Sequence, residues 1–226
     1  MTLQINIKET LGELTTSEAK NAPDILFCEG DINLLLEGIR VSVVGSRNVS
    51  PSGIIRAQSL TRALVKHGIT VVSGLAEGVD TIAHRTAIEN GGKTIAVLGT
   101  PLSQVYPKSN TALLESIKTN HLAISQFPEN YPFQKKNFPV RNRTMALISD
   151  ATIIIEAKEN SGTRHQGWEA LRLGRIVYLL ENVVQDKANT WAQEMLNYGA
   201  QILTRENLED YLYAIPSLTG RKEVVF

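Results

Sequence analysis

Six short runs of β-branched and other apolar residues alternate with stretches of helical periodicity, and this alternation constrains the fold more than any other feature of the sequence. The runs are Val41 to Val44, Ile69 to Val72, Thr94 to Leu98, Leu122 to Ser125, Thr152 to Ile155 and Ile176 to Leu180. Such alternation predicts a doubly wound α/β fold, in which helices cover both faces of a mostly parallel sheet. Ligands of these sheets bind at the carboxyl ends of the strands, so residues that directly follow each run are the first candidates for a site.

The length of the chain limits the number of domains. With 226 residues, of which 42% are hydrophobic, one sizeable α/β core can form. We predict a leader over residues 1–40 that packs on the core, a core domain over residues 41–215 and a tail over residues 216–226.

The overall charge gives no reason to expect a nucleic-acid ligand, because the chain has no net positive charge. The sequence has 23 Lys and Arg against 23 Asp and Glu, so any such ligand would have to be held by a local basic patch. Cys28 is the single cysteine, which excludes an intramolecular disulfide, and no cluster of Cys and His has metal-ligand spacing. We therefore predict neither a metal nor a cofactor. Without a signal sequence or a membrane-spanning apolar run, we expect a soluble cytoplasmic protein that makes no membrane contact.

The first run ends at Gly45, Ser46 and Arg47, a pattern typical of a phosphate-binding turn. A glycine lets the backbone approach an anion, the first amides of the following helix point at it, and an arginine can close over it. For Ser46, a phosphate contact and a helix cap are both consistent with the sequence.

Ser73 and Gly74 repeat this arrangement one run later, where glycines serve tight turns as well as ligands. Asp80 and His84, four residues apart, share one face of the next predicted helix and can form a structural hydrogen-bonded pair.

Basic residues gather further along the chain. Lys108, followed by Asn110, lies on a loop after the third run, where it either contacts a phosphate or is solvated. Arg141 and Arg143 flank Asn142 at a helix start near Lys135 and Lys136, and this cluster favours phosphate contacts over surface ion pairs. Three aromatic residues that interleave with these charges, Tyr131, Phe133 and Phe138, offer either stacking surfaces for bases or anchors for the loop.

After the fifth run come Glu156 and then Ser161 and Gly162. A serine-glycine helix start favours an anion, and a glutamate at the end of a strand can accept hydrogen bonds from a ribose or a base edge.

Six motifs occur in a fixed order: Gly45-Ser-Arg47, Ser73-Gly-Leu-Ala-Glu-Gly-Val-Asp-Thr-Ile-Ala-His84, Thr94-Ile-Ala-Val-Leu-Gly99, Tyr106-Pro-Lys-Ser-Asn110, Phe138-Pro-Val-Arg-Asn-Arg143, and Glu156 followed by Ser161-Gly162. Together they resemble the DNA-processing protein A family, DprA or Smf, from about Ala22 to about Leu203. The resemblance implies an extended Rossmann-like domain that binds single-stranded DNA, with a DNA-contacting lysine at Lys108. It also implies a role in natural transformation, in which a recombinase is loaded onto incoming strands.

The chain departs from the family pattern at three places, one of which is the replacement of a downstream glycine by Asn189, Thr190 and Trp191. Arg164, His165 and Gln166 stand where the family has small and apolar residues, and Glu181 and Asn182 replace a proline-glycine pair. These changes bear on the pocket and not on the fold. Members often carry a helical domain before the core and a winged helix after it, and we expect this chain to be a nearly bare core.

Two functions follow as hypotheses. The first is a non-enzymatic, homodimeric protein of DNA uptake and recombination that holds single-stranded DNA and presents it to a RecA-type recombinase. The alternative is a sensor or hydrolase of nucleotide derivatives in a signalling or defence system. In that case Glu156, His165 and the hydroxyls of Ser46 and Ser161 would converge on a phosphate or a glycosidic bond.

Overall fold

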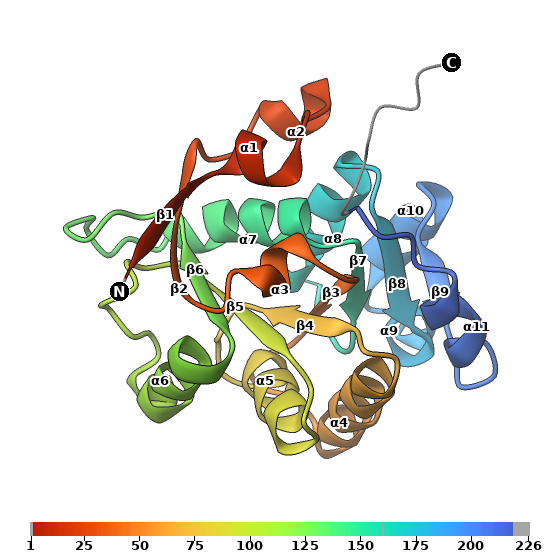
Figure 1. The fold of residues 1–226 in the computed structure, drawn as a ribbon. Coiled ribbons are helices and arrows are strands. Elements are labelled where there is room, and N and C mark those ends of the chain that lie inside the picture. Colours follow the sequence, from red (N-terminus) through yellow and green to blue (C-terminus); the bar gives the residue numbers. More distant parts are fainter. Residues whose placement is uncertain (1, 160, 219–226) are drawn as a thin grey trace.

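One sheet organises the molecule. The structure, a computed structural model, describes residues 2–159 and 161–218, and within them nine strands form a single sheet in the order β1-β2-β6-β5-β4-β3-β7-β8-β9 (Figure 1). The strands are β1 (Leu3–Asn6), β2 (Ile25–Gly30), β3 (Arg40–Val44), β4 (Thr70–Ser73), β5 (Thr94–Leu98), β6 (Leu122–Ser125), β7 (Ala151–Ile154), β8 (Ile176–Leu180) and β9 (Gln201–Leu203).

The central strands run parallel and agree with the sequence prediction. Each of the six predicted runs lies within one residue of a strand from β3 to β8. β3 pairs with β4 on one side and β7 on the other, which sets Val41 opposite Val71 and Ala151. β1 and β2 add antiparallel pairs at the edge beside β6. The predicted α/β fold with a mostly parallel sheet is confirmed.

Helices cover both faces of the sheet, with α4, α5 and α6 on one face and α7, α8 and α10 on the other (Figure 1). The helices are α1 (Ile7–Leu11), α2 (Thr16–Ala19), α3 (Asn33–Leu36), α4 (Pro51–Lys66), α5 (Val79–Glu89), the 3-10 helix η1 (Lys108–Asn110), α6 (Thr111–Asn120), α7 (Asn137–Ile148), α8 (Gly162–Arg172), α9 (Glu181–Gln185), α10 (Thr190–Asn197) and α11 (Leu208–Tyr213).

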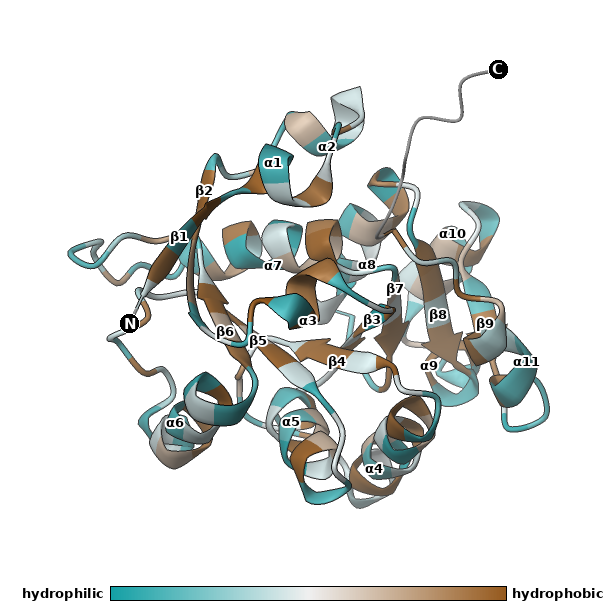
Figure 2. Cartoon of the chain, viewed as in Figure 1, coloured by the Kyte–Doolittle hydropathy of each residue, from teal (hydrophilic) through white to brown (hydrophobic). Residues whose placement is uncertain are grey.

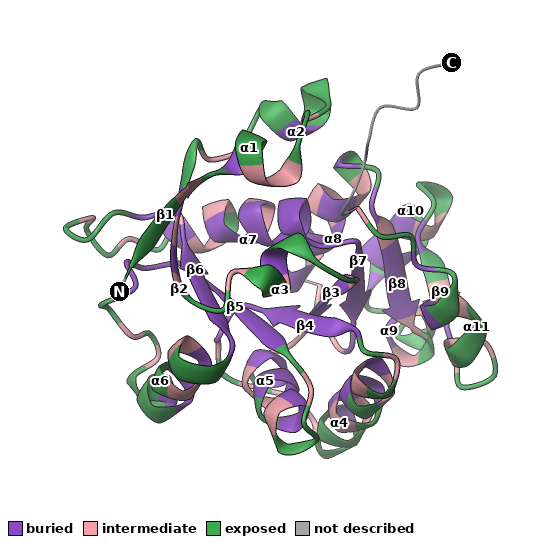
Figure 3. Cartoon of the chain, viewed as in Figure 1, coloured by how far each residue is buried: buried purple, intermediate pink, exposed green. Residues whose placement is uncertain are grey.

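The core lies in two layers, one on each face of the sheet. On the α7 and α8 face, Ile148, Trp191 and Met195 are buried together, whereas Leu64 and Ala83 of α4 and α5 pack on the opposite face. The central strands are apolar (Figure 2) and buried along their length (Figure 3), because helices cover them on both sides. This rigid centre positions the loops that leave the strands.

The order of the strands reverses at β3. The chain places β4, β5 and β6 successively to one side of β3 and then crosses through α7 to β7, which pairs with β3 on the other side. The connections that leave the carboxyl ends of β3 and β7 therefore diverge. A crevice is expected at such a switch point, and it is where ligands of open α/β sheets bind.

The two ends of the described chain contact the core. β1 and β2, which lie within the predicted leader, extend the same sheet, and the backbone amide of Leu218 donates to a carboxylate oxygen of Asp150. The division into leader, core and tail stays a prediction, and most of the predicted tail, residues 219–226, lies outside the described residues. Among the described residues, no helix is long and apolar enough to span a membrane.

Candidate functional site

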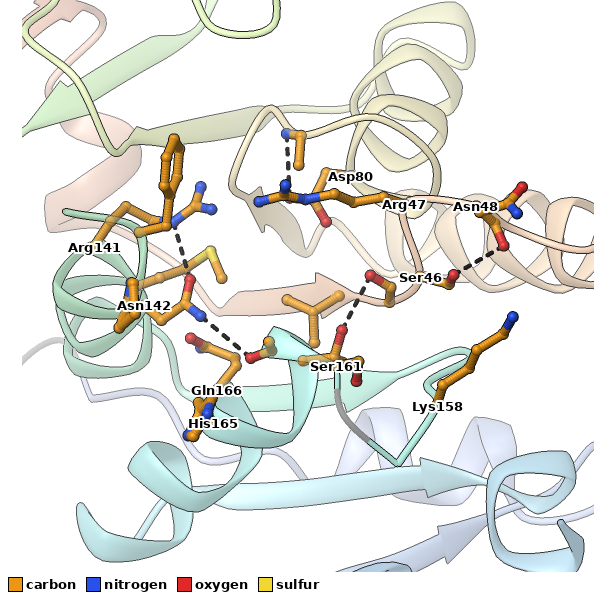
Figure 4. A pocket seen from close by; sticks show the side chains of 18 of the residues that line it. Ser46, Arg47, Asn48, Asp80, Arg141, Asn142, Lys158, Ser161, His165 and Gln166 are labelled. Carbon is orange, nitrogen blue, oxygen red and sulfur yellow. Dashed lines mark hydrogen bonds between the residues drawn. The ribbon is translucent and has the colours of Figure 1, made fainter. Parts of the chain in front are cut away.

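A pocket of about 670 Å³ lies at the carboxyl ends of β3 and β7, at the switch point of the sheet. Its walls come from the loop after β3, the start of α5, the helix α7, the loop after β7 and the first turns of α8 (Figure 4). The lining residues are Val44, Gly45, Ser46, Arg47, Asn48, Ala76, Asp80, Phe138, Pro139, Arg141, Asn142, Met145, Lys158, Glu159, Ser161, Gly162, Thr163, His165 and Gln166.

The turn after β3 is fixed by backbone contacts on two sides. The amide of Ser46 donates to the carbonyl of Glu156 at 2.8 Å, and the amide of Val79 donates to the carbonyl of Ser46 at 3.2 Å. Gly78 has a φ of +75°, and a Cβ there would overlap the carbonyls of Ser46 and Arg47, so a side chain is excluded on both grounds. This packing holds Arg47 at the rim of the pocket.

The N-terminus of α4 does not face the pocket, contrary to the prediction from the turn after the first run. Ser50 caps this helix by accepting from the amide of Gly53 at 3.0 Å. The carboxylate of Glu156 accepts from both the amide and the hydroxyl of Ser50, so a fixed negative charge already occupies the helix end. Ser46 does not cap the helix either, because its hydroxyl donates to the carbonyl of Asn48 at 2.9 Å.

The N-terminus of α8 lies at the pocket instead. Ser161 is the N-cap residue, yet its side chain makes no capping hydrogen bond, and its buried Oγ has no partner among the described residues. The first amides of a helix have no intrahelical acceptor and carry partial positive charge. Thr163 ties this helix start to the turn after β3 by donating to the carbonyl of Gly45 at 3.1 Å. The two loops therefore form one wall, with a favourable place for an anion between them.

Positive charge at the rim comes from Arg47 and Lys158. Both side chains are exposed, and in residues 2–159 and 161–218 neither forms an ion pair. The guanidinium of Arg47 lies 5.7 Å from the ring centroid of Phe138, which directs it across the pocket (Figure 4). Lys158 was not singled out from the sequence, although its position four residues after β7 placed it in the same loop as Glu156.

Arg141 forms part of the pocket floor and is buried, not a free surface cation. Its Nη1 donates to the carbonyl of Gly74 and, at 2.8 Å, to that of Val97, and its Nε donates to Asn142 at 3.0 Å. Gly74 leaves the space for this guanidinium, because a Cβ there would overlap it. Burial lowers the pKa of Arg141, the nearby Asp80 carboxylate opposes that fall, and the charge of Arg47 adds to it.

Asp80 and His84 are not hydrogen-bonded to each other, so the predicted pair does not form. Asp80 accepts from the amides of Gly74 at 3.1 Å and Ala76 at 3.3 Å, and burial raises the pKa of its carboxyl. His84 contacts the hydroxyl of Thr94 through Nδ1 at 2.7 Å. Burial lowers the pKa of His84 to about 3, and the charges of His121 and Arg141 contribute, so this imidazole is neutral in the folded protein.

Seven of the predicted site residues meet in the pocket: Gly45, Ser46, Arg47, Arg141, Asn142, Ser161 and Gly162. The other six, Ser73, Gly74, Lys108, Asn110, Arg143 and Glu156, do not line it. Of the residues that depart from the family pattern, His165 and Gln166 line the pocket, whereas Arg164, Glu181 and Asn182 do not.

Most of the residues outside the pocket have structural contacts. Ser73 donates to the carbonyl of Val43 at 2.8 Å, and Asn110 donates to Leu75 at 2.9 Å. Arg143 pairs with Glu169 of α8 at 3.3 Å, so the predicted basic cluster is divided between the pocket floor and an ion pair. Lys108 is exposed on η1.

An aromatic cluster adjoins the pocket through Phe138. The ring centroids of Tyr106 and Phe133 lie 5.4 Å and 5.9 Å from that of Phe138, whereas Tyr131 packs on Phe127 at 5.0 Å. Phe138 thus joins the lining to two exposed rings, and Tyr131 anchors its loop. In the described part of the chain, no group of three or more His, Cys, Asp or Glu residues could hold a metal ion.

Comparison with known proteins identifies relatives that match most of the chain. The chain is 37% identical over 188 residues to the DNA processing protein DprA of Streptococcus pneumoniae and 31% identical over 194 residues to that of Bacillus subtilis, covering 83% and 86% of this chain. It spans 66% and 65% of the length of these two relatives.

Two solved structures of DNA processing protein A superpose on the chain. The one from Streptococcus pneumoniae has a TM-score of 0.82 at 33% identity and covers 95% of this chain and 75% of that one. The one from Helicobacter pylori, which concerns that protein's single-stranded DNA binding mode, has a TM-score of 0.79 at 26% identity and covers 94% of each chain. The model of the DNA recombination-mediator protein A family matches residues 9–215. The chain therefore belongs to the DNA recombination-mediator protein A family.

Proposed function

We propose that this chain is a single-stranded DNA-binding, DNA-processing protein of the DprA type, and that the pocket at the switch point holds part of the bound strand. The observation that carries the proposal is the convergence of the exposed Arg47 and the open N-terminus of α8 on one pocket. Family membership and the DNA-binding relative from Helicobacter pylori support it.

The chemistry of the pocket suits a phosphate backbone. Arg47 and Lys158 supply exposed positive charge at the rim, and the amides at the start of α8 with the Ser161 hydroxyl supply fixed donors below it. The overall charge of the chain is zero, so affinity has to come from this local group. Binding should then weaken steeply with salt and show little dependence on base sequence.

We assign the contacts to the predicted residues that line the pocket and give the others supporting roles. Glu156 fixes the start of α4, and Gly74 makes room for Arg141. Lys108 is exposed, as is Tyr106 two residues before it, and we propose that Lys108 contacts the strand where it leaves the pocket.

The role of the bound strand is also a proposal. We infer that the protein acts in DNA uptake and recombination, as a homodimer in the cytoplasm that presents the strand to a RecA-type recombinase. The family description as a recombination mediator supports this role. Light scattering at increasing protein concentration tests the dimer. Recombinase filament formation on coated strands, with and without this protein, tests the presentation of DNA.

We propose a binding protein and not an enzyme. The alternative hydrolase requires the Glu156 carboxylate to reach the substrate with His165. His165 lines the pocket, but Glu156 does not, and both of its carboxylate oxygens accept hydrogen bonds from Ser50. Turnover of nucleotide derivatives that is lost in Glu156→Gln would contradict the proposal.

The test of the proposed function is fluorescence anisotropy with labelled single-stranded and duplex oligonucleotides over a range of salt concentrations. Arg47→Ala should weaken single-strand binding about tenfold at low salt and make the salt slope shallower by about 0.7 for each lost phosphate contact. Arg62→Ala is the matched control, because Arg62 is an exposed arginine of α4 that does not line the pocket. Equal losses in both variants, or no binding by the folded parent chain at low salt, would contradict the proposal.

A further inference from the structure

Gln166 is a buried amide in the pocket wall with no hydrogen-bonding partner among the described residues. It lies on α8, its side chain is 1% exposed, and neither Nε2 nor Oε1 has a partner in the described part of the chain. It nevertheless lines the pocket, on the same wall as Ser161 and His165 (Figure 4). A buried polar group without a partner destabilises the folded state, and among the described residues both polar atoms of this amide are such groups.

The surroundings of Gln166 limit what can satisfy this amide. Gly167 follows it and packs against Met195 and Ile154, while Met145 and Val44 contribute apolar surface to the same pocket. Asn142 lines the pocket from α7; its Oδ1 accepts from Arg141, and its Nδ2 donates to the carbonyl of Gly162 at 3.5 Å. The amide of Asn142 is therefore already engaged, and a partner for Gln166 has to enter through the pocket.

We propose that Gln166 pairs through its amide with the edge of one unstacked nucleobase of the bound strand. An amide presents one donor beside one acceptor, and each natural base has an edge with the complementary arrangement, as in the bidentate contact of Gln with adenine. This inference rests on the proposed binding of single-stranded DNA.

The size and polarity of the pocket fit a nucleotide and not a phosphate alone. Its volume of about 670 Å³ lies in the range of sites that enclose small organic ligands. Arg47 is exposed at the rim, the start of α8 lies below it, and Gln166 lies in the buried wall. The ring of Phe138 lines the same pocket and adds aromatic surface for a base whose edge meets Gln166.

The proposal adds a kind of selectivity that phosphate binding does not give. A site that contacts only the backbone binds an abasic strand as well as a normal one, whereas a site with a paired amide distinguishes a hydrogen-bonding base from a base of the same shape that lacks polar edges. Sequence preference stays small, because all four bases can satisfy the amide.

The experiment uses a short oligonucleotide in which every residue is abasic except one. That residue is thymine in one strand and difluorotoluene, a non-polar analogue of the same shape, in the other. Anisotropy at low salt is measured for the full chain, for Gln166→Met, which keeps an unbranched side chain of similar size, and for the Arg62→Ala control. Difluorotoluene keeps the stacking surface, so the ratio of the two affinities reports the hydrogen bonds alone.

The parent chain and Arg62→Ala should bind the thymine strand about tenfold more tightly than the difluorotoluene strand, as expected for a bidentate amide contact. Gln166→Met should bind both strands equally, and Arg47→Ala should weaken both by the same factor. Gln166→Met should unfold at no lower temperature than the parent, because it removes two unpaired polar groups. If it does not fold, Gln166→Leu replaces it.

Three results would overturn the proposal. If the parent binds the two strands equally, Gln166 does not read a base, although the proposed DNA binding stands. If the preference for thymine persists in Gln166→Met, another residue makes the contact. If the parent also fails to bind an ordinary oligonucleotide at low salt, the proposed function fails and this inference fails with it.

Discussion

Arginines lie at both ends of the parallel strands, in opposite environments. We call the side of the sheet where these strands end the carboxyl edge and the side where they begin the amino edge. At the carboxyl edge, Arg47 is exposed at the rim of a pocket of about 670 Å³ and forms no ion pair within the described residues. At the amino edge, Arg40 is 1% exposed, and its Nε lies 3.4 Å from a carboxylate oxygen of Asp150, which also accepts from its backbone amide at 2.6 Å.

The amino edge joins distant parts of the chain. Asp150 lies just before β7 and accepts from Arg40 at the start of β3 and from the amide of Leu218. Arg175, just before β8, pairs with the buried carboxylate of Glu18 in α2. Burial of Glu18 acts to raise its pKa, but the hydrogen bonds from Thr15 and Arg175 outweigh this effect and the net pKa is lowered. The cavity that remains here is about 20 Å³.

The comparison shows how one residue type serves two purposes in one fold. Paired and buried charges close the amino edge and tie the terminal segments to the core. Exposed charges, and polar groups without a partner among the residues that the structure describes, remain at the carboxyl edge, where the diverging connections of β3 and β7 leave a crevice. Stability should therefore depend on the first set and DNA binding on the second.

The largest effect on stability is expected for Asp150→Ala. Removal of one member of a buried pair leaves the Arg40 charge without compensation, which costs about 3–5 kcal/mol of unfolding free energy. Urea denaturation measures it. The control is Glu209→Ala, because Glu209 is 60% exposed and its contacts with Lys66 at 3.5 Å and His67 at 3.0 Å should contribute less than about 1 kcal/mol. A loss for Asp150→Ala no larger than that of the control would remove the distinction between the edges.

Arg141→Met tests the exception to the comparison, a buried arginine on the pocket side. Its guanidinium donates to the carbonyls of Gly74 and Val97, and its loss would remove a donor from both of them beside the Asp80 carboxylate. We expect a loss of about 3 kcal/mol together with weaker DNA binding. Gly74→Ala should reproduce both effects, because its Cβ would displace the guanidinium. If Arg141→Met is as stable as the parent chain, Arg141 does not stabilise the fold and resembles the exposed cations of the rim.

A third prediction concerns His84, which lies in the core between the two edges. Its pKa is about 3 when folded and 6.5 when exposed, so the unfolded chain binds more protons between these values. The stability from this residue is complete above pH 6.5 and is lost as the pH falls towards 3, by roughly 5 kcal/mol over the whole interval. Denaturation curves between pH 7 and pH 4 should show a shallower decline for His84→Asn, whose amide can still donate to Thr94. Identical slopes would contradict a neutral buried imidazole.

The smallest effect on stability is expected for Arg47→Ala, within about 0.5 kcal/mol, because the side chain is exposed and makes no ion pair in the described ranges. The same variant should nevertheless bind single-stranded DNA much more weakly than the parent chain. Arg143→Ala should instead lose stability and keep its affinity for single-stranded DNA. Arg143 is 42% exposed, pairs with Glu169 and lies outside the pocket lining. Equal affinities of these two variants for single-stranded DNA would show that both arginines contact the strand.

The sequence predicted the central sheet because each buried parallel strand is a short run of apolar residues between helical stretches. It did not predict β1, β2 or β9. β9 has three residues, and the apolar residues of β1 and β2 include Leu3 and Ile25, which are 49% and 43% exposed, so the pattern of burial there is weak.

The candidate site was predicted in part. Arg47 and Ser161 follow strands on either side of the switch point, so their meeting follows from topology. The position of the Glu156 carboxylate at α4 did not follow, because it depends on side-chain direction between residues 106 apart. For the same reason the sequence did not distinguish Arg141, buried on backbone carbonyls, from Arg143, paired at the surface.

The most direct test of the account is amide hydrogen–deuterium exchange of the full chain with and without a single-stranded oligonucleotide. We predict slower exchange on binding at residues 45–48 and 161–163, and unchanged exchange around Arg40, Asp150 and Arg175 at the amino edge. Protection at the amino edge, or bound DNA with no protection at the start of α8, would contradict the assignment of DNA binding to the switch-point pocket.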